Sequence, residues 1–436
     1  MPSPKGHQVL SVIRTSWPLL LGMLLLMLGN GLQGSLLGVR GSTLGFSSVE
    51  MSLVMSAYFA GFLLASRVTP DMIRRVGHVR VFAALGSFVS AALLLFPTIQ
   101  DPIAWIIGRV VIGFCFCGVY VTAESWLNNA STNETRGQAL SAYMIVQMLG
   151  IIIAQGLLVV PDPSGYLLFV IPSVLVSIAF APILLSISPT PAFESTKRMT
   201  LVELYRTSPL GCVGMFLMGS VFAAQFGMAA VYATGAGLSI GQIPIFTAAF
   251  YVGALIFQYP VGWLSDRFDR RVLIALSALI AGLASLMGMF FGGNFYVLVA
   301  AAFLIGGLSN PLYSLLIAYT NDFLEHEDMA AASAGLLFVN GVGAIAGPVI
   351  IGYAMQIMGP PGYFILLAFV LLALTGYAFY RMTQRPAPSS EDTNAYQSMM
   401  PTASPVTVEF ASEWAIETAE AGAQDAGRTR KQADTA

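Results

Sequence analysis

Charged residues are scarce in this chain of 436 residues. Asp, Glu, Lys and Arg together make up 10% of the sequence, whereas soluble globular proteins contain about 25%. Hydrophobic residues make up 56%, and the mean hydropathy is +0.76. This balance is far from that of a soluble domain, and it predicts a chain that lies largely within a membrane.

Cysteine and histidine are also rare, with 3 of each. Cys115, Cys117 and Cys212 lie within long apolar segments, so we expect no disulfide. The histidines are scattered, and no cluster of His, Glu and Cys has the spacing of metal ligands. The Gly-x-x-x-x-Gly-Lys-Ser/Thr pattern of a phosphate-binding loop is missing as well. We therefore expect no metal, no cofactor and no enzymatic activity.

Long apolar segments occupy most of the sequence before the last fifty or so residues. Each is about twenty residues long, which is enough for a helix to cross a bilayer. We predict twelve spans, at residues 17–39, 49–66, 79–98, 102–124, 138–160, 165–188, 209–234, 242–264, 272–292, 295–319, 332–357 and 362–380. The first lacks a small-residue cleavage site, so we interpret it as a membrane helix and not as a signal peptide. The sequence thus predicts an all-α, polytopic membrane protein.

Positive charge lies on one side of these spans. Of the 20 Lys and Arg residues, only Arg40 lies in a loop after an odd-numbered span, and Arg109 lies within a span. The others fall at the termini, in loops after even-numbered spans or, for Arg80, at the start of the span that follows such a loop. The positive-inside rule places this side in the cytoplasm. We therefore predict a multi-pass protein of the cell (inner) membrane with both termini in the cytoplasm.

The two halves of the chain share a register. A gapless offset of 192 residues aligns Gln33 with Gln225 and Gly61 with Gly253. A register shared over several spans predicts two parallel six-helix pseudo-repeats. Parallel repeats are one plan of membrane transporters, in which the substrate site lies at mid-membrane between the halves.

This repeat predicts the domain organisation. We expect an N-terminal six-helix bundle at 1–190, a cytoplasmic linker at 191–208 and a C-terminal six-helix bundle at 209–385. Residues 386–436 are polar and rich in Pro, Ala and Thr, so they predict a disordered cytoplasmic tail.

The stretch GWLSDRFDRR, residues Gly262–Arg271, concentrates charge between the eighth and ninth spans. It resembles the signature loop of the major facilitator superfamily, Gly-x-x-x-Asp-Arg-x-Gly-Arg-Arg, although Asp269 stands where that family has Gly. Arg109-Val-Val-Ile-Gly113 resembles the Arg-x-x-x-Gly of span 4 in the same family. Glu124-Ser-Trp-Leu, at the end of span 4, resembles the same region in a little-characterised bacterial branch of this family. The resemblance covers all of the chain except the tail, and it implies twelve spans and transport by alternating access.

We interpret the charged loop as part of a cytoplasmic gate. Its acids are not needed for positive-inside retention, and a pair such as Asp266 with Arg270 could hold one state and release in the other. The candidate gating residues are Glu124, Arg136, Asp266, Arg267, Arg270 and Arg271. Two simpler interpretations stay open: the loop is a topology anchor alone, and Glu124 is a solvated helix end.

Arg109 is the one clear charge at membrane depth, where charged residues are usually functional. Uncharged polar residues accompany it on spans 1, 7 and 10, which with span 4 line the central cavity in the superfamily. The predicted substrate-binding set is Asn30, Gln33, Arg109, Gln225, Asn310 and Tyr313. The alternatives are that Arg109 extends to the outer headgroups and that the amides only join helices.

These residues predict a secondary active or facilitative transporter of a small organic solute. No acid lies at membrane depth beside Arg109, so we favour an anionic or polar solute that would offset its charge. An exporter of apolar, drug-like compounds and a transport-inactive receptor with the same fold are the alternatives. We expect a monomer in the lipid bilayer, with no nucleic-acid partner.

Overall fold

The computed structural model describes residues 4–131, 135–160, 165–184, 199–384, 396, 398–400 and 406–407. Its N-terminal helices are α1 (Pro4–Thr43), α2 (Ser48–Val76), α3 (His78–Leu95), α4 (Pro102–Ala130), α5 (Arg136–Leu157) and α6 (Leu167–Leu184). The later ones are α7 (Leu201–Thr207), α8 (Pro209–Ala223), the π-helix η1 (Ala224–Met228), α9 (Ala229–Gly235), α10 (Gln242–Ser265), α11 (Arg270–Phe290), α12 (Phe295–Asn321), α13 (His326–Met358) and α14 (Gly362–Gln384). All regular structure in the described ranges is helical, as the composition predicts.

Eleven segments of the described chain are long and apolar enough to cross a membrane. One of them, Pro209–Gly235, combines α8, η1 and α9. The remaining predicted span, 165–188, coincides with α6, whose apolar part is the shorter Leu167–Pro182. Residues 185–188 lie outside the described residues, so the full length of this span stays a prediction. The all-helical, multi-pass fold is confirmed.

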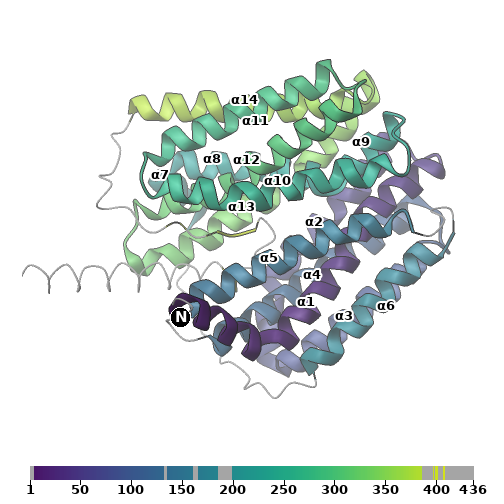
Figure 1. Ribbon diagram of the computed structural model, residues 1–436, viewed down its shortest axis with the longest axis horizontal. Coiled ribbons are helices and arrows are strands. Elements are labelled where there is room, and N and C mark those ends of the chain that lie inside the picture. Colours follow the sequence, from purple (N-terminus) through teal and green to yellow (C-terminus); the bar gives the residue numbers. More distant parts are fainter. Residues whose placement is uncertain are drawn as a thin grey trace, which may run out of the picture.

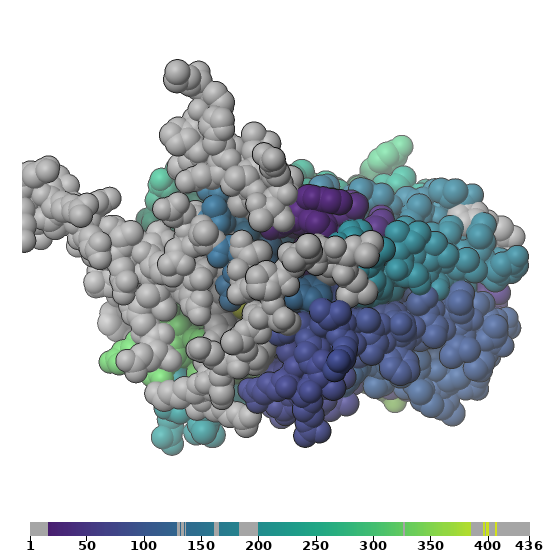
Figure 2. Space-filling view, turned by 90° about the horizontal axis from the view of Figure 1, so that it is seen from below, coloured from purple at the N-terminus to yellow at the C-terminus, as the bar shows by residue number. Residues whose placement is uncertain are grey.

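Helices α1–α6 form one bundle and α7–α14 form the other, and Figure 1 shows the two lying against each other. On the N-terminal half, α3 and α6 lie side by side, joined by the Ser90 hydroxyl at 2.8 Å from that of Ser173. This face of the molecule is turned toward the viewer in Figure 2. Exposed apolar side chains of these two helices include Phe88 and Ile178, as a lipid-facing surface requires.

Equivalent glycines produce the same helix crossing in both halves. A Cβ added at Gly61 would lie 2.0 Å from the carbonyl oxygen of Val110, and one added at Gly253 would lie 2.1 Å from that of Phe303. Only glycine permits such close approach of two backbones. The crossing of α2 with α4 therefore matches that of α10 with α12. This confirms the predicted equivalence of Gly61 and Gly253 in the two repeats.

The end of the molecule that holds the loops 44–47, 96–101 and 236–241 is here called the outer end, from the predicted orientation. There the two halves pack closely. A Cβ at Gly352 of α13 would lie 2.3 Å from the Ser52 hydroxyl of α2. A Cβ at Gly38 of α1 would lie 2.9 Å from Ala230 of α9. The halves are thus closed against each other at the outer end.

Part of the tail lies against the C-terminal half, at the opposite or inner end. Met399 and Met400 are 5% and 4% exposed, and both belong to the apolar core of the described chain. The prediction that the tail is disordered did not include this contact. For the tail residues outside the described positions it stays a prediction, because polar composition reports only what a segment cannot bury by itself.

Candidate functional site

Arg109 of α4 is completely buried, with 0% of its side chain exposed. Its Nη1 donates a hydrogen bond to Gln33 Oε1 at 2.8 Å, and its Nε makes a longer one to the Val54 carbonyl at 3.4 Å. The guanidinium lies over the Tyr58 ring, 4.7 Å from the ring centre. Among the described residues no carboxylate pairs with it. The site therefore contains a cation held by an amide, a carbonyl and an aromatic face.

The start of α4 fixes the depth of this cation. Asp101 caps the helix by accepting hydrogen bonds from the amides of Ile103 and Ala104, and Pro102 occupies the first turn. Arg109 follows seven residues later, so it lies about 10 Å from the outer end of the helix. Because its side chain is buried among α1, α2 and α4, the alternative that it extends to the outer headgroups is wrong.

A chain of hydrogen bonds continues inward from Gln33. Its Nε2 donates to Asn30 Oδ1 at 3.0 Å, and Asn30 Nδ2 donates to the hydroxyl of Tyr120 at 2.8 Å. The structure thus brings together the predicted residues of spans 1 and 4. Sequence reasoning missed Tyr58 and Tyr120. Tyr120 could have been found, because it follows Arg109 by eleven residues, about three helical turns, so that Arg109 and Tyr120 lie on one face of α4.

A second polar cluster belongs to the C-terminal half. Gln225 of η1 donates to the Ser309 hydroxyl at 2.7 Å, and Asn310 Nδ2 donates to Gln225 Oε1 at 3.2 Å. Asn310 Oδ1 and the Tyr313 hydroxyl are buried, and no hydrogen-bond partner for either lies in the described part of the chain. Ser309 is the member that the sequence did not single out. Unsatisfied buried polar atoms are costly, so these two are available for a ligand.

The π-helical turn η1 joins the two clusters. π-helical turns are rare in proteins, and those that occur often lie at functional sites. Phe226 of η1 contacts the Tyr58 ring with centres 5.5 Å apart. A Cβ at Gly227 would lie 3.0 Å from the Met55 side chain of α2. The turn that carries Gln225 therefore packs against Tyr58 and Met55, the residues that cover Arg109.

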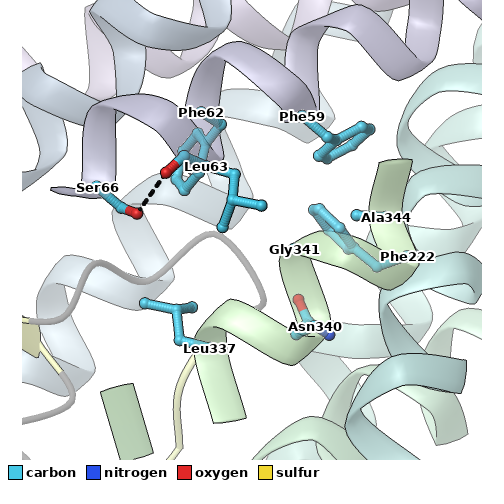
Figure 3. A pocket seen from close by; sticks show the side chains of 9 residues that line it. All are labelled: Phe59, Phe62, Leu63, Ser66, Phe222, Leu337, Asn340, Gly341 and Ala344. Carbon is cyan, nitrogen blue, oxygen red and sulfur yellow. Dashed lines mark hydrogen bonds between the residues drawn. The ribbon is translucent and has the colours of Figure 1, made fainter. Parts of the chain in front are cut away.

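An apolar cavity lies beside η1, between the halves. Its walls come from α2, α8 and α13. Figure 3 shows Phe59 of α2 next to Phe222 of α8, and the ring centres lie 6.1 Å apart in an edge-to-face contact. The lining residues are Phe59, Phe62, Leu63, Ser66, Phe222, Leu337, Asn340, Gly341 and Ala344. The cavity has a volume of about 20 Å³, which is room for little more than a water molecule, so an apolar solute would need the walls to move apart. Of the polar lining groups, the Asn340 amide is already engaged, because it donates to the Met215 carbonyl at 3.1 Å.

Arg270 binds chiefly to Asp322 and only weakly to Asp266. Its Nη1 lies 2.5 Å from Asp322 Oδ1, whereas its Nη2 lies 3.9 Å from Asp266 Oδ1. Both partners of the short pair are buried, while the Asp266 side chain is 46% exposed. These contacts tie α11 to the end of α12 within the C-terminal half. The role of Asp266 with Arg270 as a gate latch stays a prediction.

The other predicted gating residues have different surroundings. Asp269 caps α11 and pairs with Arg271 at 2.7 Å. Burial raises the pKa of Asp269, but the hydrogen bonds and the positive charge of Arg271 lower it by more than burial raises it. The pKa of Asp269 therefore lies below its ordinary value. Arg267 stacks on Trp263, 4.1 Å from the ring centre.

Glu124 is buried rather than solvated. It is 1% exposed and accepts a hydrogen bond from the Tyr143 hydroxyl of α5 at 3.1 Å. The interpretation of Glu124 as a solvated helix end is therefore wrong for this state. Arg136 begins α5, and its side chain lies outside the described residues.

Two helical bundles that enclose a polar site at mid-membrane define the class of protein as a membrane transporter built from parallel repeats. A sequence model of the Major Facilitator Superfamily matches residues 19–246 and 210–416. The chain belongs to this family, and it is a multi-pass membrane protein that transports a small solute. Membership in a transporter family agrees with the expectation that the chain is not an enzyme.

Relatives cover most of the chain. The uncharacterized MFS-type transporter YcaD of Salmonella arizonae is 26% identical over 374 residues, which are 85% of this chain and 95% of that protein. YcaD of Salmonella typhi is 26% identical over 372 residues, 84% and 94% of the two chains. These relatives agree with the predicted placement in a little-characterised bacterial branch.

Solved structures share the fold at low sequence identity. A variant of the nucleoside transporter NupG has a TM-score of 0.74 at 12% identity, covering 84% of this chain and 99% of that one. A bacterial homolog of the human lysosomal transporter Spinster, in an inward-facing and unoccupied conformation, has a TM-score of 0.65 at 15% identity, covering 96% and 99%. At such identities the likeness shows the fold alone.

Proposed function

We propose that this protein moves a small organic solute with an anionic or strongly polar acceptor group across the inner membrane by alternating access. The observation that supports it is the pair of polar clusters, one from each half, with η1 of the second packed against Tyr58 of the first. Arg109 has one short hydrogen bond and no carboxylate partner in the described residues. A guanidinium has five N–H donors, so donors are left for an acceptor group of the solute.

The C-terminal cluster would hold the other end of the solute. Asn310 Oδ1 is a buried acceptor without a donor, and the Tyr313 hydroxyl is a buried donor and acceptor without a partner in the described chain. A solute that also carries an N–H or O–H group would satisfy Asn310. Contacts to both halves would couple binding to their relative motion, because a ligand shifts a conformational equilibrium only through differential affinity. The remaining expectations, a monomer with both termini in the cytoplasm, are part of the same proposal.

A second candidate is an exporter of apolar compounds. The aromatic cavity between α2, α8 and α13 favours it, because Phe59, Phe62 and Phe222 offer ring faces and few polar groups (Figure 3). Such a solute would bind beside η1 and would make no use of the charge of Arg109.

A thermal-shift screen of the purified protein separates the two candidates. The probes are organic acids, neutral polar solutes such as sugars, and hydrophobic cations, each tested on the wild type, Arg109→Met and Phe222→Ala. We expect stabilisation by organic acids that Arg109→Met removes and Phe222→Ala retains. Stabilisation by hydrophobic cations alone, lost in Phe222→Ala and kept in Arg109→Met, would reject the proposal in favour of the exporter.

A further inference from the structure

The tail residue Tyr396 lies along one face of α10. Its hydroxyl accepts a hydrogen bond from Gln258 Nε2 at 3.0 Å, and its backbone amide donates to Asp266 Oδ1 at 3.0 Å. Between these contacts its ring lies against Gly262, where an added Cβ would be 2.7 Å from two ring carbons. Gln258, Gly262 and Asp266 are spaced by four residues, so they form one stripe on the helix. The ring, the hydroxyl and the backbone amide of Tyr396 each contact one residue of this stripe.

Met399 docks on the neighbouring helix α12. Its backbone amide donates to the Ser314 hydroxyl at 2.8 Å, and that hydroxyl donates to the Met399 carbonyl at 3.2 Å. Ser314 is seven residues from the end of α12 at Asn321, a depth of about 10 Å. The side chains of Met399 and Met400 are buried. The tail therefore enters the transmembrane part of the molecule rather than resting on its surface.

This docking position lies directly below the proposed solute site. Asn310 precedes Ser314 by four residues, one turn and about 6 Å along the same face of α12. In Figure 1 the described tail fragment (yellow) lies below α12 and α13, on the side of the C-terminal half that faces the N-terminal half. The outer end is closed by contacts between the halves, so the remaining route from Asn310 leads past Ser314 to the inner end.

We propose that the C-terminal tail is an internal ligand of this protein, whose residues Tyr396 and Ser398–Met400 bind the inner ends of α10 and α12 and block the route between the solute site and the cytoplasm. The inference rests on the proposed function for the meaning of that route. It also gives Gly262 and Asp266 of the charged loop a second role, as the docking surface for the tail. A blocked route lowers the fraction of the protein that can exchange solute with the cytoplasm.

The test uses thiol labelling, which needs no solute. Asn310→Cys is introduced where the native Cys115, Cys117 and Cys212 are alanine, and N-ethylmaleimide is applied to inverted membrane vesicles. Removal of residues 386–436 is expected to raise the labelling rate several-fold, and Tyr396→Ala in the full chain is expected to raise it as well. Val76→Cys, exposed at the inner end of α2, is the control whose labelling should not change.

Gly262→Ala provides a matched probe of the contact itself. The nearest atoms to its new methyl group would all belong to the Tyr396 ring, so it should raise the labelling of Asn310→Cys in the full chain and have no effect once the tail is removed. An unchanged rate after tail removal would overturn the proposal, as would an equal effect of Gly262→Ala with and without the tail. Neither result bears on solute binding, which the thermal-shift screen measures separately.

Discussion

Thr247 of α10 donates a hydrogen bond to Gln155 Oε1 of α5 at 2.9 Å, and this bond joins the two halves of the protein near their outer end. The same oxygen accepts a second hydrogen bond from Ser35 of α1 at 2.6 Å. Gln155 Nε2 donates to the Gly31 carbonyl at 3.2 Å. One buried amide therefore ties α1, α5 and α10 together, and in alternating access this link must break when the outer end opens.

Thr247→Val should favour the outward-open state. It removes one buried hydrogen bond between the halves, worth about 0.5–1.5 kcal/mol, which is up to a roughly tenfold change in the equilibrium. Val231→Cys, buried near the contact of α9 with Gly38, should then react faster with an impermeant maleimide applied from outside. The control is Thr375→Val, whose hydroxyl bonds only within the C-terminal half. Equal reactivity in both variants would show that the link does not hold the outer end closed.

Gln33→Leu should destabilise the protein through Arg109. The substitution removes the one short hydrogen bond of a buried cation, and hydrogen bonds to charged groups contribute about 1.5–3 kcal/mol. Gln225→Leu, in the aligned position of the other half, removes neutral partners and should cost less. Thermal unfolding in detergent measures both. Arg109→Met should restore much of the stability of Gln33→Leu, since the charge is then gone; strict additivity of the two changes would contradict this coupling.

Asp322→Asn should lower stability far more than Asp266→Asn. Loss of one partner of a buried ion pair costs about 3–5 kcal/mol. Asp322 and Arg270 form such a pair, because both side chains are buried and Arg270 Nη1 lies 2.5 Å from Asp322 Oδ1. Asp266 is 46% exposed at 3.9 Å from Arg270, and exposed pairs contribute about 1 kcal/mol or less. Thermal unfolding of the two variants, with the tail removed from both, isolates the ion pairs. Similar losses would mean that Arg270 uses the two acids alike.

Asp269 should make stability depend on pH in the acid range. Its folded-state pKa is below the ordinary value of about 3.9. Its contribution is therefore complete above the unfolded pKa and is lost as pH falls through the folded pKa. Asp269→Asn keeps a helix cap but removes the pairing with Arg271. We expect this variant to be less stable at pH 7 and to lose less stability than the wild type on acidification, as followed by unfolding at pH 7 and below pH 4; parallel losses would exclude the role of Asp269.

The sequence by itself determined the membrane class, the helical content and the repeat. Runs of about twenty apolar residues can be stable in lipid only as helices or closed barrels, because every backbone polar group must be satisfied internally. The aligned Gly61 and Gly253 marked equivalent crossings, since glycine alone allows that approach. The six polar residues of the proposed site could also be singled out, because polar groups at membrane depth are few, and their role in binding a solute stays a prediction.

Tertiary structure decided which of these groups are satisfied and which are free to bind. The partner of Arg109 is Gln33 of another helix, the Tyr58 ring covers it, and Asp322 lies fifty-two positions from Arg270. The closed outer end and the docking of Met399 on Ser314 likewise join residues far apart in the chain. Periodicity and composition report which face of a helix is apolar. Which helix meets that face, and at what depth, follows only from packing of the whole bundle, since helices in lipid associate through close contacts rather than through hydrophobicity.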